Sequence, residues 1–293
     1  MVTKVVPGLL IATPDAAQAG REACARMTRA IHDALEERGA ATIALSGGSS
    51  PLDAYRALAE QSIDWNKVHV YWVDERAVPP EHERSNYGAA KKALLDAIAI
   101  PPGNVHRMRA EDPDLEKAAA DYDAELRDTV KAKVGGLPAL DLVVLGVGDD
   151  GHTASLFPRE DTVHVTDRLV AAVPARDGRE ARLTLTAPVL ENAKASTIIV
   201  LGKSKHEPLE RIWATSGDLN ETPARVIRGF RGGDHVGAIA PPRRHGLSPA
   251  LPRLTAFARA GLDRAPRAAR VGLRERRRPR AERRSAPNRG GAH

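Results

Sequence analysis

The sequence predicts an α/β fold, a single Rossmann-like domain with a mostly parallel sheet covered by helices on both faces. Short apolar runs such as DLVVLGV and STIIVLG alternate with helix-length segments, which is the pattern of parallel strands buried on both sides. Polar, glycine-rich turns follow these runs, and such sheets bind ligands at the turns beyond the carboxyl ends of the strands. The chain of 293 residues is long enough to bury a substantial core.

The first half of the chain carries clear strand and helix boundaries. Residues 5–12 predict an edge strand, and a helix is expected over residues 14–38, with Thr13 as N-cap, Pro14 at its first position and Gly39 past its end. The elements expected next are a buried strand at 40–45, a helix at 51–60, a strand at 67–73, a polar loop at 74–85, a helix at 87–99 capped by Ser85 or Asn86, and a helix at 114–134 ending at Gly135 and Gly136.

The second half continues this alternation up to residue 231. Strands are expected at 139–147, 169–173, 182–186 and 196–202, with helices near 187–193 and 205–215. From Gly232 neither period persists, and Pro and Arg become dense. We therefore expect an α/β domain over residues 1–231 and a disordered tail over residues 232–293.

Charge divides the chain at the same place. Residues 232–293 contain 15 Arg, no Lys and four acids, a net charge of +11, whereas the whole chain carries +6. Residues 1–231 are therefore acidic, at −5, so we expect no nucleic-acid partner except through the tail. The apolar runs are too short to span a bilayer, and the single Cys24 excludes an internal disulfide and a multi-cysteine metal site. A cytoplasmic protein is expected.

The turn LSGGSSP, after the first buried strand, is a candidate phosphate cradle. Its glycines would let the backbone approach an anion, its serines offer hydroxyl groups, and the following helix N-terminus favours negative charge. These residues are Ser46, Gly47, Gly48, Ser49 and Ser50. The same composition also suits an ordinary strand-to-helix turn.

The segment VDER places Asp74, Glu75 and Arg76 at the same edge of the sheet. Because successive residues of an extended chain point in different directions, we expect one acid to face the site and the other to be structural. Arg76 could stabilise developing negative charge, or it could pair with a neighbouring acid in a solvated charge run.

The most informative segment is GVGDDGHTASLFP, residues 146–158. His152 has the side chain best suited to proton transfer near neutral pH, and Asp150 could orient its ring. Glycines and acids crowded around this histidine at the end of a strand favour catalysis over a structural role. Asp149 and Asp150 could hold a divalent cation, but two acids are weak evidence, and we expect no metal.

Two further cations, Arg182 and Lys205, lie at element boundaries, where they could bind a phosphate or remain surface charges. The sequence has no Gly-x-Ser-x-Gly, His-Glu-x-x-His or helix-opening Gly-x-Gly-x-x-Gly motif. The sequence therefore lacks the motifs that usually indicate a serine hydrolase, a zinc peptidase or a dinucleotide-binding protein.

Five segments, in this order and spacing, resemble the 6-phosphogluconolactonase family: LSGGSSPLDAYRAL, VYWVDERAVPPEHERSNYGAAKKALL, DLVVLGVGDDGHTASLFP, RLTLTAPVLENA and VLGKSKHEPLERI. The resemblance covers about residues 5–231. It implies a single-domain fold shared with glucosamine-6-phosphate deaminase and ribose-5-phosphate isomerase. It also implies hydrolysis of 6-phosphogluconolactone, in the oxidative pentose phosphate pathway, without a metal or cofactor.

The resemblance further implies a role for each candidate residue. The phosphate group of the substrate would be bound by Ser46, Gly47, Gly48, Ser49, Arg182 and Lys205. His152, oriented by Asp150, would deprotonate a water molecule that attacks the lactone carbonyl, and Asp74 and Arg76 would line the reacting end. Arg76 would stabilise the tetrahedral oxyanion, and the protein would act as a monomer.

Two other functions stay open. Deaminases of amino-sugar phosphates share the Asp-Gly-His core but typically read Asp-Gly-His-Ile-Ala-Phe-Asn-Glu-Pro, and this chain has Phe157 in place of that glutamate. They also read Asp-Glu-Tyr where this chain has Arg76 as the third residue. A sugar-phosphate-sensing regulator would need a DNA-binding module. The Arg-rich tail could bind nucleic acid by charge alone, but no helix-turn-helix fits before Ser46.

The chain departs from the family after RVIRGFRG. Members usually continue into a last strand with a Trp and an Asp, whereas Gly232 is followed by GDHVGAIAPPRRHG, where we expect no such strand. The abrupt change in composition is what an altered reading frame in a GC-rich gene, or a genuine basic extension, would produce. A missing last strand would leave a sheet edge or a core face uncovered.

Overall fold

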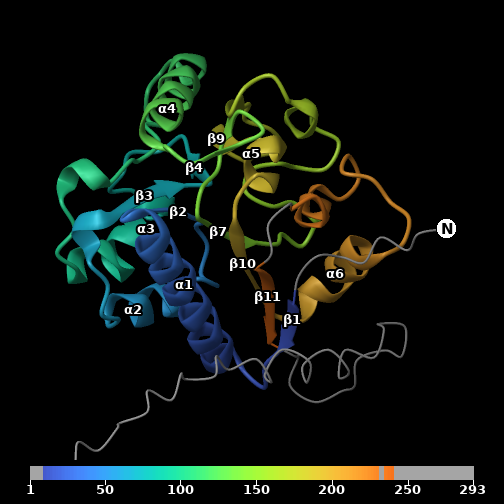
Figure 1. Cartoon of the computed structure of the whole chain (residues 1–293). Coiled ribbons are helices and arrows are strands. Elements are labelled where there is room, and N and C mark those ends of the chain that lie inside the picture. The colour runs from blue at the N-terminus through green and yellow to red at the C-terminus, as the bar shows by residue number, and fades with distance from the viewer. Residues whose placement is uncertain (1–8, 231–233, 241–293) are drawn as a thin grey trace, which may run out of the picture.

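A six-stranded parallel sheet lies at the centre of the molecule, which confirms the expected fold class (Figure 1). The structure is a computed structural model that describes residues 9–230 and 234–240. Across the sheet, the strands are β1 (Leu9–Ala12), β11 (Asp234–Ala240), β10 (Ala195–Leu201), β7 (Leu142–Gly146), β2 (Ala41–Leu45) and β3 (Val68–Trp72). The strand expected near the N-terminus is thus β1, at one edge of the sheet.

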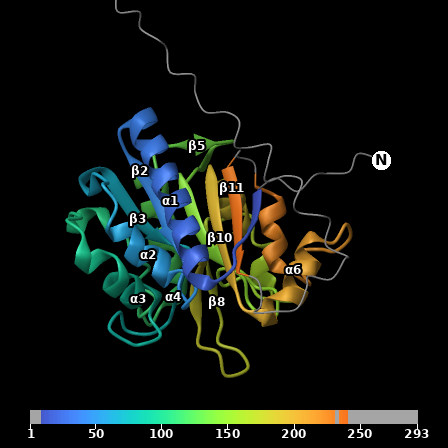
Figure 2. The ribbon, with the colours of Figure 1, turned by 90° about the horizontal axis from the view of Figure 1, so that it is seen from below.

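Helices flank this sheet on both faces. The α-helices of the described residues are α1 (Ala16–Arg38), α2 (Leu52–Ala59), α3 (Asn86–Ala93), α4 (Leu115–Thr129), α5 (Ala187–Glu191) and α6 (His206–Trp213). Short 3₁₀ helices occupy Trp65–Lys67, Leu95–Ala97, Pro102–Asn104, Asp161–His164, Lys203–Lys205 and Pro223–Arg228. The longest helix, α1, lies across the sheet and contacts β2, β7, β10 and β11 (Figures 1 and 2).

The boundaries of α1 follow the rules of helix capping, with one correction. The N-cap is Asp15, whose carboxylate accepts a hydrogen bond from the backbone N–H of Gln18 at 2.7 Å. The prediction of Thr13 as N-cap is therefore wrong, because its hydroxyl instead donates to the carbonyl of Asp15. Gly39 ends the helix as expected, with a φ of 73° that favours glycine.

A second, three-stranded sheet is antiparallel and consists of β4 (Asp74–Arg76), β9 (Arg182–Leu185) and β8 (Val170–Val173). The prediction that 169–173 and 182–186 join the parallel sheet is wrong, as is that of a loop throughout 74–85. Asp177 and Gly178, at φ of 51° and 76°, form a tight turn between β8 and β9. Parallel neighbours would need a crossover of about a dozen residues or more, which this short connection does not supply.

The helix expected over residues 114–134 is also shorter than predicted. It ends at Thr129 and gives way to a small hairpin of β5 (Lys133–Val134) and β6 (Leu137–Pro138). Gly135 and Gly136, which were expected to stop the helix, form the turn of this hairpin at φ of 60° and 83°. Two consecutive residues with positive φ suit a two-residue hairpin turn better than a helix end.

Strand β11 contradicts one expectation made from the sequence. No strand was expected after Gly232, yet Asp234–Ala240 lies between β1 and β10 and pairs in parallel with both. Two neighbours that both offer backbone hydrogen bonds can order a segment whose own sequence signal is weak. The sheet therefore extends beyond the predicted boundary at residue 231. The remainder of the predicted tail, residues 241–293, lies outside the described residues.

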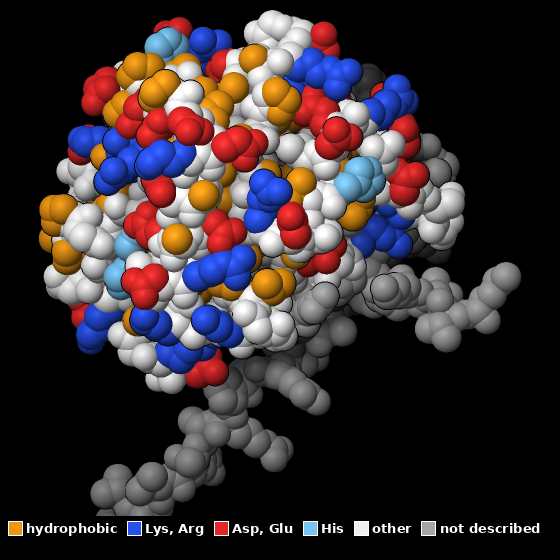
Figure 3. Space-filling view, turned by 90° about the horizontal axis from the view of Figure 1, so that it is seen from above, with side chains coloured by type: hydrophobic (Ala, Val, Ile, Leu, Met, Phe, Trp, Pro, Cys, Tyr) orange, Lys and Arg blue, Asp and Glu red, His pale blue; other side chains and the backbone are white. Residues whose placement is uncertain are grey.

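The surface seen in Figure 3 carries both signs of charge, with Lys and Arg interspersed among Asp and Glu. Hydrophobic side chains on this face are scattered among the charged ones. No helix in residues 9–230 and 234–240 combines the length and the apolar character needed to cross a lipid bilayer.

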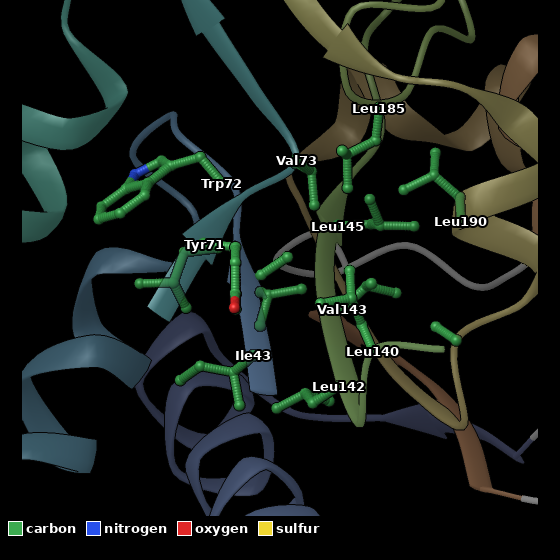
Figure 4. Close-up of a cluster of buried hydrophobic side chains, with 14 of the residues drawn as sticks. Ile43, Tyr71, Trp72, Val73, Leu140, Leu142, Val143, Leu145, Leu185 and Leu190 are labelled. Carbon is green, nitrogen blue, oxygen red and sulfur yellow. The ribbon is translucent and has the colours of Figure 1, made fainter. Parts of the chain in front are cut away.

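The core joins the two sheets. Leu145 of β7 is fully buried, and Figure 4 shows it beside Leu185 of β9 and Leu190 of α5. A backbone hydrogen bond of 2.8 Å from Leu185 to the carbonyl of Val73 ties β9 to the end of β3. The antiparallel sheet is thus fixed beside the carboxyl ends of the parallel strands, where the polar turns lie.

Candidate active site

The polar turns that follow β2, β3, β7 and β10 meet at one edge of the sheet. The side-chain amide of Asn86 donates to the carbonyl and to Oδ1 of Asp74, at 2.9 and 3.1 Å, and the Ser155 hydroxyl donates to Oδ2 at 2.7 Å. The Lys205 ammonium forms a 2.5 Å ion pair with Asp149. Segments far apart in the sequence are therefore joined by direct contacts.

The serine loop, residues 46–50, is anchored at its start by a buried tyrosine. The backbone N–H of Ser46 donates to the Tyr55 hydroxyl at 3.0 Å, and this hydroxyl donates to the Ser46 carbonyl at 2.9 Å. Burial raises the pKa of Tyr55 well above its ordinary value, so the hydroxyl keeps its proton. Further along, Gly48 has a φ of 83°, and Gly48 and Ser49 are exposed at the N-terminus of α2. The loop can receive an anion from solvent.

Position 47 requires glycine because the side chain of Asn86 lies close to it, and not because of its φ. A methyl group added there would lie 1.6 Å from Oδ1 of Asn86. Since Asn86 also holds Asp74, this contact couples the serine loop to the acid after β3.

The two acids of VDER take different roles, as their alternation predicts. Asp74 is directed toward Ser155, whereas Glu75 is buried and caps α3, accepting hydrogen bonds from the backbone of Asn86 and Tyr87. Burial raises the pKa of Glu75, and these hydrogen bonds oppose the rise. Glu75 is therefore the structural acid of the pair.

Arg76 and Arg182 face each other across β4 and β9. Directly opposed residues of antiparallel strands project from the same face, so both side chains leave the sheet together. Nη1 of Arg182 lies 3.4 Å from the Ser155 hydroxyl and 3.7 Å from Oδ2 of Asp74. Burial lowers the pKa of Arg182, and Asp74 partly offsets this. Arg76 donates to the carbonyl of Arg84.

His152 and Asp150 are in direct contact at this edge. Nδ1 of His152 lies 2.6 Å from Oδ1 of Asp150, and the backbone N–H of His152 donates to the same oxygen at 2.9 Å. Burial alone would raise the pKa of Asp150, but the hydrogen bonds and the charge interaction with His152 lower it to about 2. An ionised carboxylate can accept the Nδ1 proton, and in that tautomer of the neutral imidazole Nε2 is an acceptor. Gly148 makes room, because a methyl group there would lie 2.0 Å from Nδ1.

The aromatic ring of Phe157 connects His152 to the arginines. The imidazole and phenyl centroids are 4.6 Å apart. The guanidinium carbons of Arg179 and Arg182 lie 3.6 and 5.3 Å from the phenyl centroid, and Glu160 pairs with Arg179. Cations at such distances interact favourably with an aromatic face.

Lys205 lies beside the histidine turn. It was expected to serve the serine loop, but its ammonium pairs with Asp149, whose pKa it lowers through a hydrogen bond. Arg211 donates to the carbonyl of Asp150 at 3.0 Å. Asp149 and Asp150, the pair weighed as cation ligands, thus turn to different partners.

Four contributors to this site were missed in the sequence, namely Asn86, Ser155, Arg179 and Arg211. Asn86 was considered only as a helix cap, and Ser155 stands inside the histidine segment. The Asp-Gly pair before Arg179 is a hairpin signal that would have brought this arginine beside β9. Nothing in the sequence singles out Arg211.

Unpartnered polar atoms gather at this edge. Among the described residues, ten buried side-chain N or O atoms have no hydrogen-bond partner in the structure, and six of them belong to the site. They are Ser46 Oγ, Asn86 Oδ1 and the Nε atoms of Arg76, Arg179, Arg182 and Arg211. Buried polar groups rarely stay unpaired, so this set suits a ligand rich in anionic and hydroxyl oxygens.

The family model described as glucosamine-6-phosphate isomerases/6-phosphogluconolactonase matches residues 14–235. A 6-phosphogluconolactonase of Synechocystis is 44% identical over 69% of this chain and 83% of its own length. A 6-phosphogluconolactonase of Nostoc is 42% identical over 68% of this chain and 82% of its own length.

A solved structure shows the same likeness. The 6-phosphogluconolactonase of Thermotoga maritima superposes with a TM-score of 0.68 at 30% identity, covering 80% of this chain and all of the other (100%).

Proposed function

The chain belongs to the glucosamine-6-phosphate isomerase/6-phosphogluconolactonase family, and from this membership and the geometry we propose how it acts at the sheet edge. It is an enzyme that hydrolyses 6-phospho-D-glucono-1,5-lactone to 6-phospho-D-gluconate, a step of the oxidative pentose phosphate pathway.

The observation that carries the mechanism is the 2.6 Å contact between His152 Nδ1 and Asp150. It supports His152 as the general base, because the ionised carboxylate holds the Nδ1 proton and leaves Nε2 free to accept another. The imidazole is about one-third exposed, at 30%, so water can reach it. Nε2 takes a proton from this water as the oxygen attacks the lactone carbonyl carbon.

The remaining steps return that proton. The carbonyl oxygen becomes an oxyanion, which Arg76 stabilises from the same face as Arg182. When the intermediate collapses, the bond from the carbonyl carbon to the ring oxygen breaks, and the imidazolium gives its proton to that oxygen. The new carboxylic acid then ionises. The steps consume one water molecule and form no covalent link to the protein.

Asp74 acts by position rather than as the base. Its Oδ1 accepts from Asn86 and its Oδ2 from Ser155, and the side chain is only 7% exposed. A carboxylate engaged in this way orients its neighbours, here Ser155 and Arg182.

The substrate phosphate binds at the serine loop. Ser46, Gly47, Gly48 and Ser49 precede the N-terminus of α2, where backbone N–H groups and the helix dipole favour an anion. The cations proposed for it are Arg182 and Lys205. The partner of Lys205, Asp149, is 67% exposed, and exposed ion pairs are weak, so the ammonium can exchange it for a phosphate.

The test compares the purified enzyme with His152→Ala on freshly prepared lactone. The variant is expected to lose at least about 10²-fold in kcat, the usual contribution of a positioned general base. A variant as fast as the parent removes His152 from the mechanism. Assaying ammonia release from glucosamine 6-phosphate in parallel tests the deaminase alternative, which Phe157 disfavours because its apolar ring contacts His152.

We further propose that the protein is a cytoplasmic monomer that binds no nucleic acid through this domain. The mixed charge in Figure 3 supports the last point, since nucleic acids bind to basic patches. Salt-sensitive DNA binding that depends on residues 233–293 would favour the regulatory alternative.

A further inference from the structure

Phe157 and Arg179 form a support for the catalytic histidine. The guanidinium carbon of Arg179 lies 3.6 Å from the phenyl centroid, and the imidazole of His152 contacts the same ring at 4.6 Å between centroids. Phe157 is buried, at 5% exposure. Its ring can therefore move only if the groups packed on it move too.

Arg179 is itself held in place. Its Nη2 pairs with Glu160 at 2.5 Å, and both side chains are largely buried, at 19% and 9% exposure. Its backbone closes the two-residue turn of Asp177 and Gly178, with reciprocal hydrogen bonds to Arg176. The hairpin thus presents the guanidinium from a rigid position.

The segment that carries Phe157 is also constrained. Arg159 adopts a φ of 62°, a conformation that costs energy for a residue with a side chain, and its N–H donates to the carbonyl of Asn220 at 2.8 Å. The backbone N–H of Glu160 closes the turn by donating a hydrogen bond to the carbonyl of Phe157. Strain persists only where surrounding contacts maintain it, which suits a segment that must hold one orientation.

From these contacts we propose that Arg179 is a positioning residue for His152, acting through the Phe157 ring. Fixed by Glu160, it keeps the ring against the imidazole, so that Nε2 points at the attacking water while Asp150 holds Nδ1. This inference rests on the proposed role of His152 as base. A misplaced base loses rate while substrate affinity is kept, because Arg179 is not among the residues proposed to bind the phosphate.

The test is steady-state hydrolysis of the lactone by Arg179→Gln. We expect kcat to fall roughly tenfold with KM changed less than about twofold, given the strength of a desolvated cation–π contact. The matched control is Arg176→Gln, on the other side of the same turn, whose side chain is 58% exposed and pairs with Asp177. It should behave as the parent. Arg179→Lys, which keeps the charge but not the planar group, should recover part of kcat.

Two further variants keep the proposal falsifiable should Arg179→Gln unfold. Glu160→Gln releases the guanidinium and should lower kcat in the same way, with little added loss in the double variant. Phe157→Leu should lower kcat without raising KM. A rise in KM at constant kcat in Arg179→Gln would mean that Arg179 binds substrate directly, and parental kinetics would mean that it has no role; either result overturns the proposal.

Failure of this inference is distinguishable from failure of the proposed mechanism. If His152→Ala is inactive while Arg179→Gln matches the parent, His152 stays the base and only the support is wrong. If His152→Ala is itself fully active, the base has been misassigned.

Discussion

At the scale of single residues, the ionisation of Asp150 decides which nitrogen of His152 can act. The pKa of Asp150 is lowered to about 2, so its folded-state value lies below the ordinary 3.8. Its contribution to folding stability is therefore complete above that ordinary value and is lost as the pH falls toward 2. Activity lost on acidification nearer neutrality therefore does not come from protonation of Asp150.

The substitution Asp150→Asn tests this division of roles. An amide can present its N–H to Nδ1 and favour the wrong tautomer, so we expect kcat to fall by about 10²-fold or more. Steady-state lactone hydrolysis measures this loss.

The matched control is Asp167→Asn, an exposed carboxylate paired with Arg168 outside the site. It should keep parental kinetics. Parental kinetics in Asp150→Asn as well would mean that Asp150 does not orient the base.

Residues whose chemistry is local could be predicted from the sequence. His152 and Asp150 are two positions apart, and the structure confirms their contact. Ser155 and Asn86 could not be assigned to Asp74, because that contact depends on how separate turns meet in three dimensions. The role assigned to each of these residues in catalysis stays a prediction.

At the scale of elements, the sequence predicts the strands of the parallel sheet, but it predicts only in part which strand pairs with which. Buried strands such as β2 and β7 can be predicted because nearly all of their residues are apolar. The same signal placed β8 and β9 in the wrong sheet, since an apolar run does not specify its neighbour. The Asp177–Gly178 turn does specify it.

The serine loop yields a prediction at this scale, Gly47→Ala. The added methyl group would meet Oδ1 of Asn86 at 1.6 Å, and Asn86 cannot retreat without losing its hydrogen bonds to Asp74. We expect KM to rise roughly tenfold and the free energy of unfolding to fall by about 1–3 kcal/mol. Kinetics and chemical denaturation measure the two effects.

Gly103→Ala provides the control, because a methyl group there meets nothing within 4 Å. The double variant Gly47→Ala with Asn86→Ala should recover part of the stability but not the affinity, since the clash is relieved while the link to Asp74 is lost. If Gly47→Ala binds substrate as the parent does, the loop does not hold the phosphate.

At the scale of the whole molecule, the end of the domain is the point where sequence and structure differ most. The change to Arg-rich composition at Gly232 suggested that the fold stops there, but the sheet continues to Ala240. The composition of a segment indicates only its average tendency to form structure. A strand that lies between two others is also stabilised by both neighbours. Sequencing the gene across the codons for residues 225–240 tests the altered reading frame, and a confirmed, uninterrupted frame rejects it.

Truncation tests where the domain ends. A chain that stops after Ala240 retains β11 and should unfold at the temperature of the full chain and hydrolyse the lactone at the same rate. A chain that stops after Arg231 loses β11, which lies between β1 and β10, so β1 loses its hydrogen-bonded neighbour and β10 loses one of two. Unpaired backbone groups in a sheet are costly and promote aggregation, so the shorter chain should lose its cooperative unfolding transition and its activity.

Thermal unfolding, light scattering and lactone hydrolysis, measured at equal protein concentrations, show whether the domain needs β11. If the chain ending at Arg231 matches the full chain in all three, β11 is dispensable and the domain ends where composition changes.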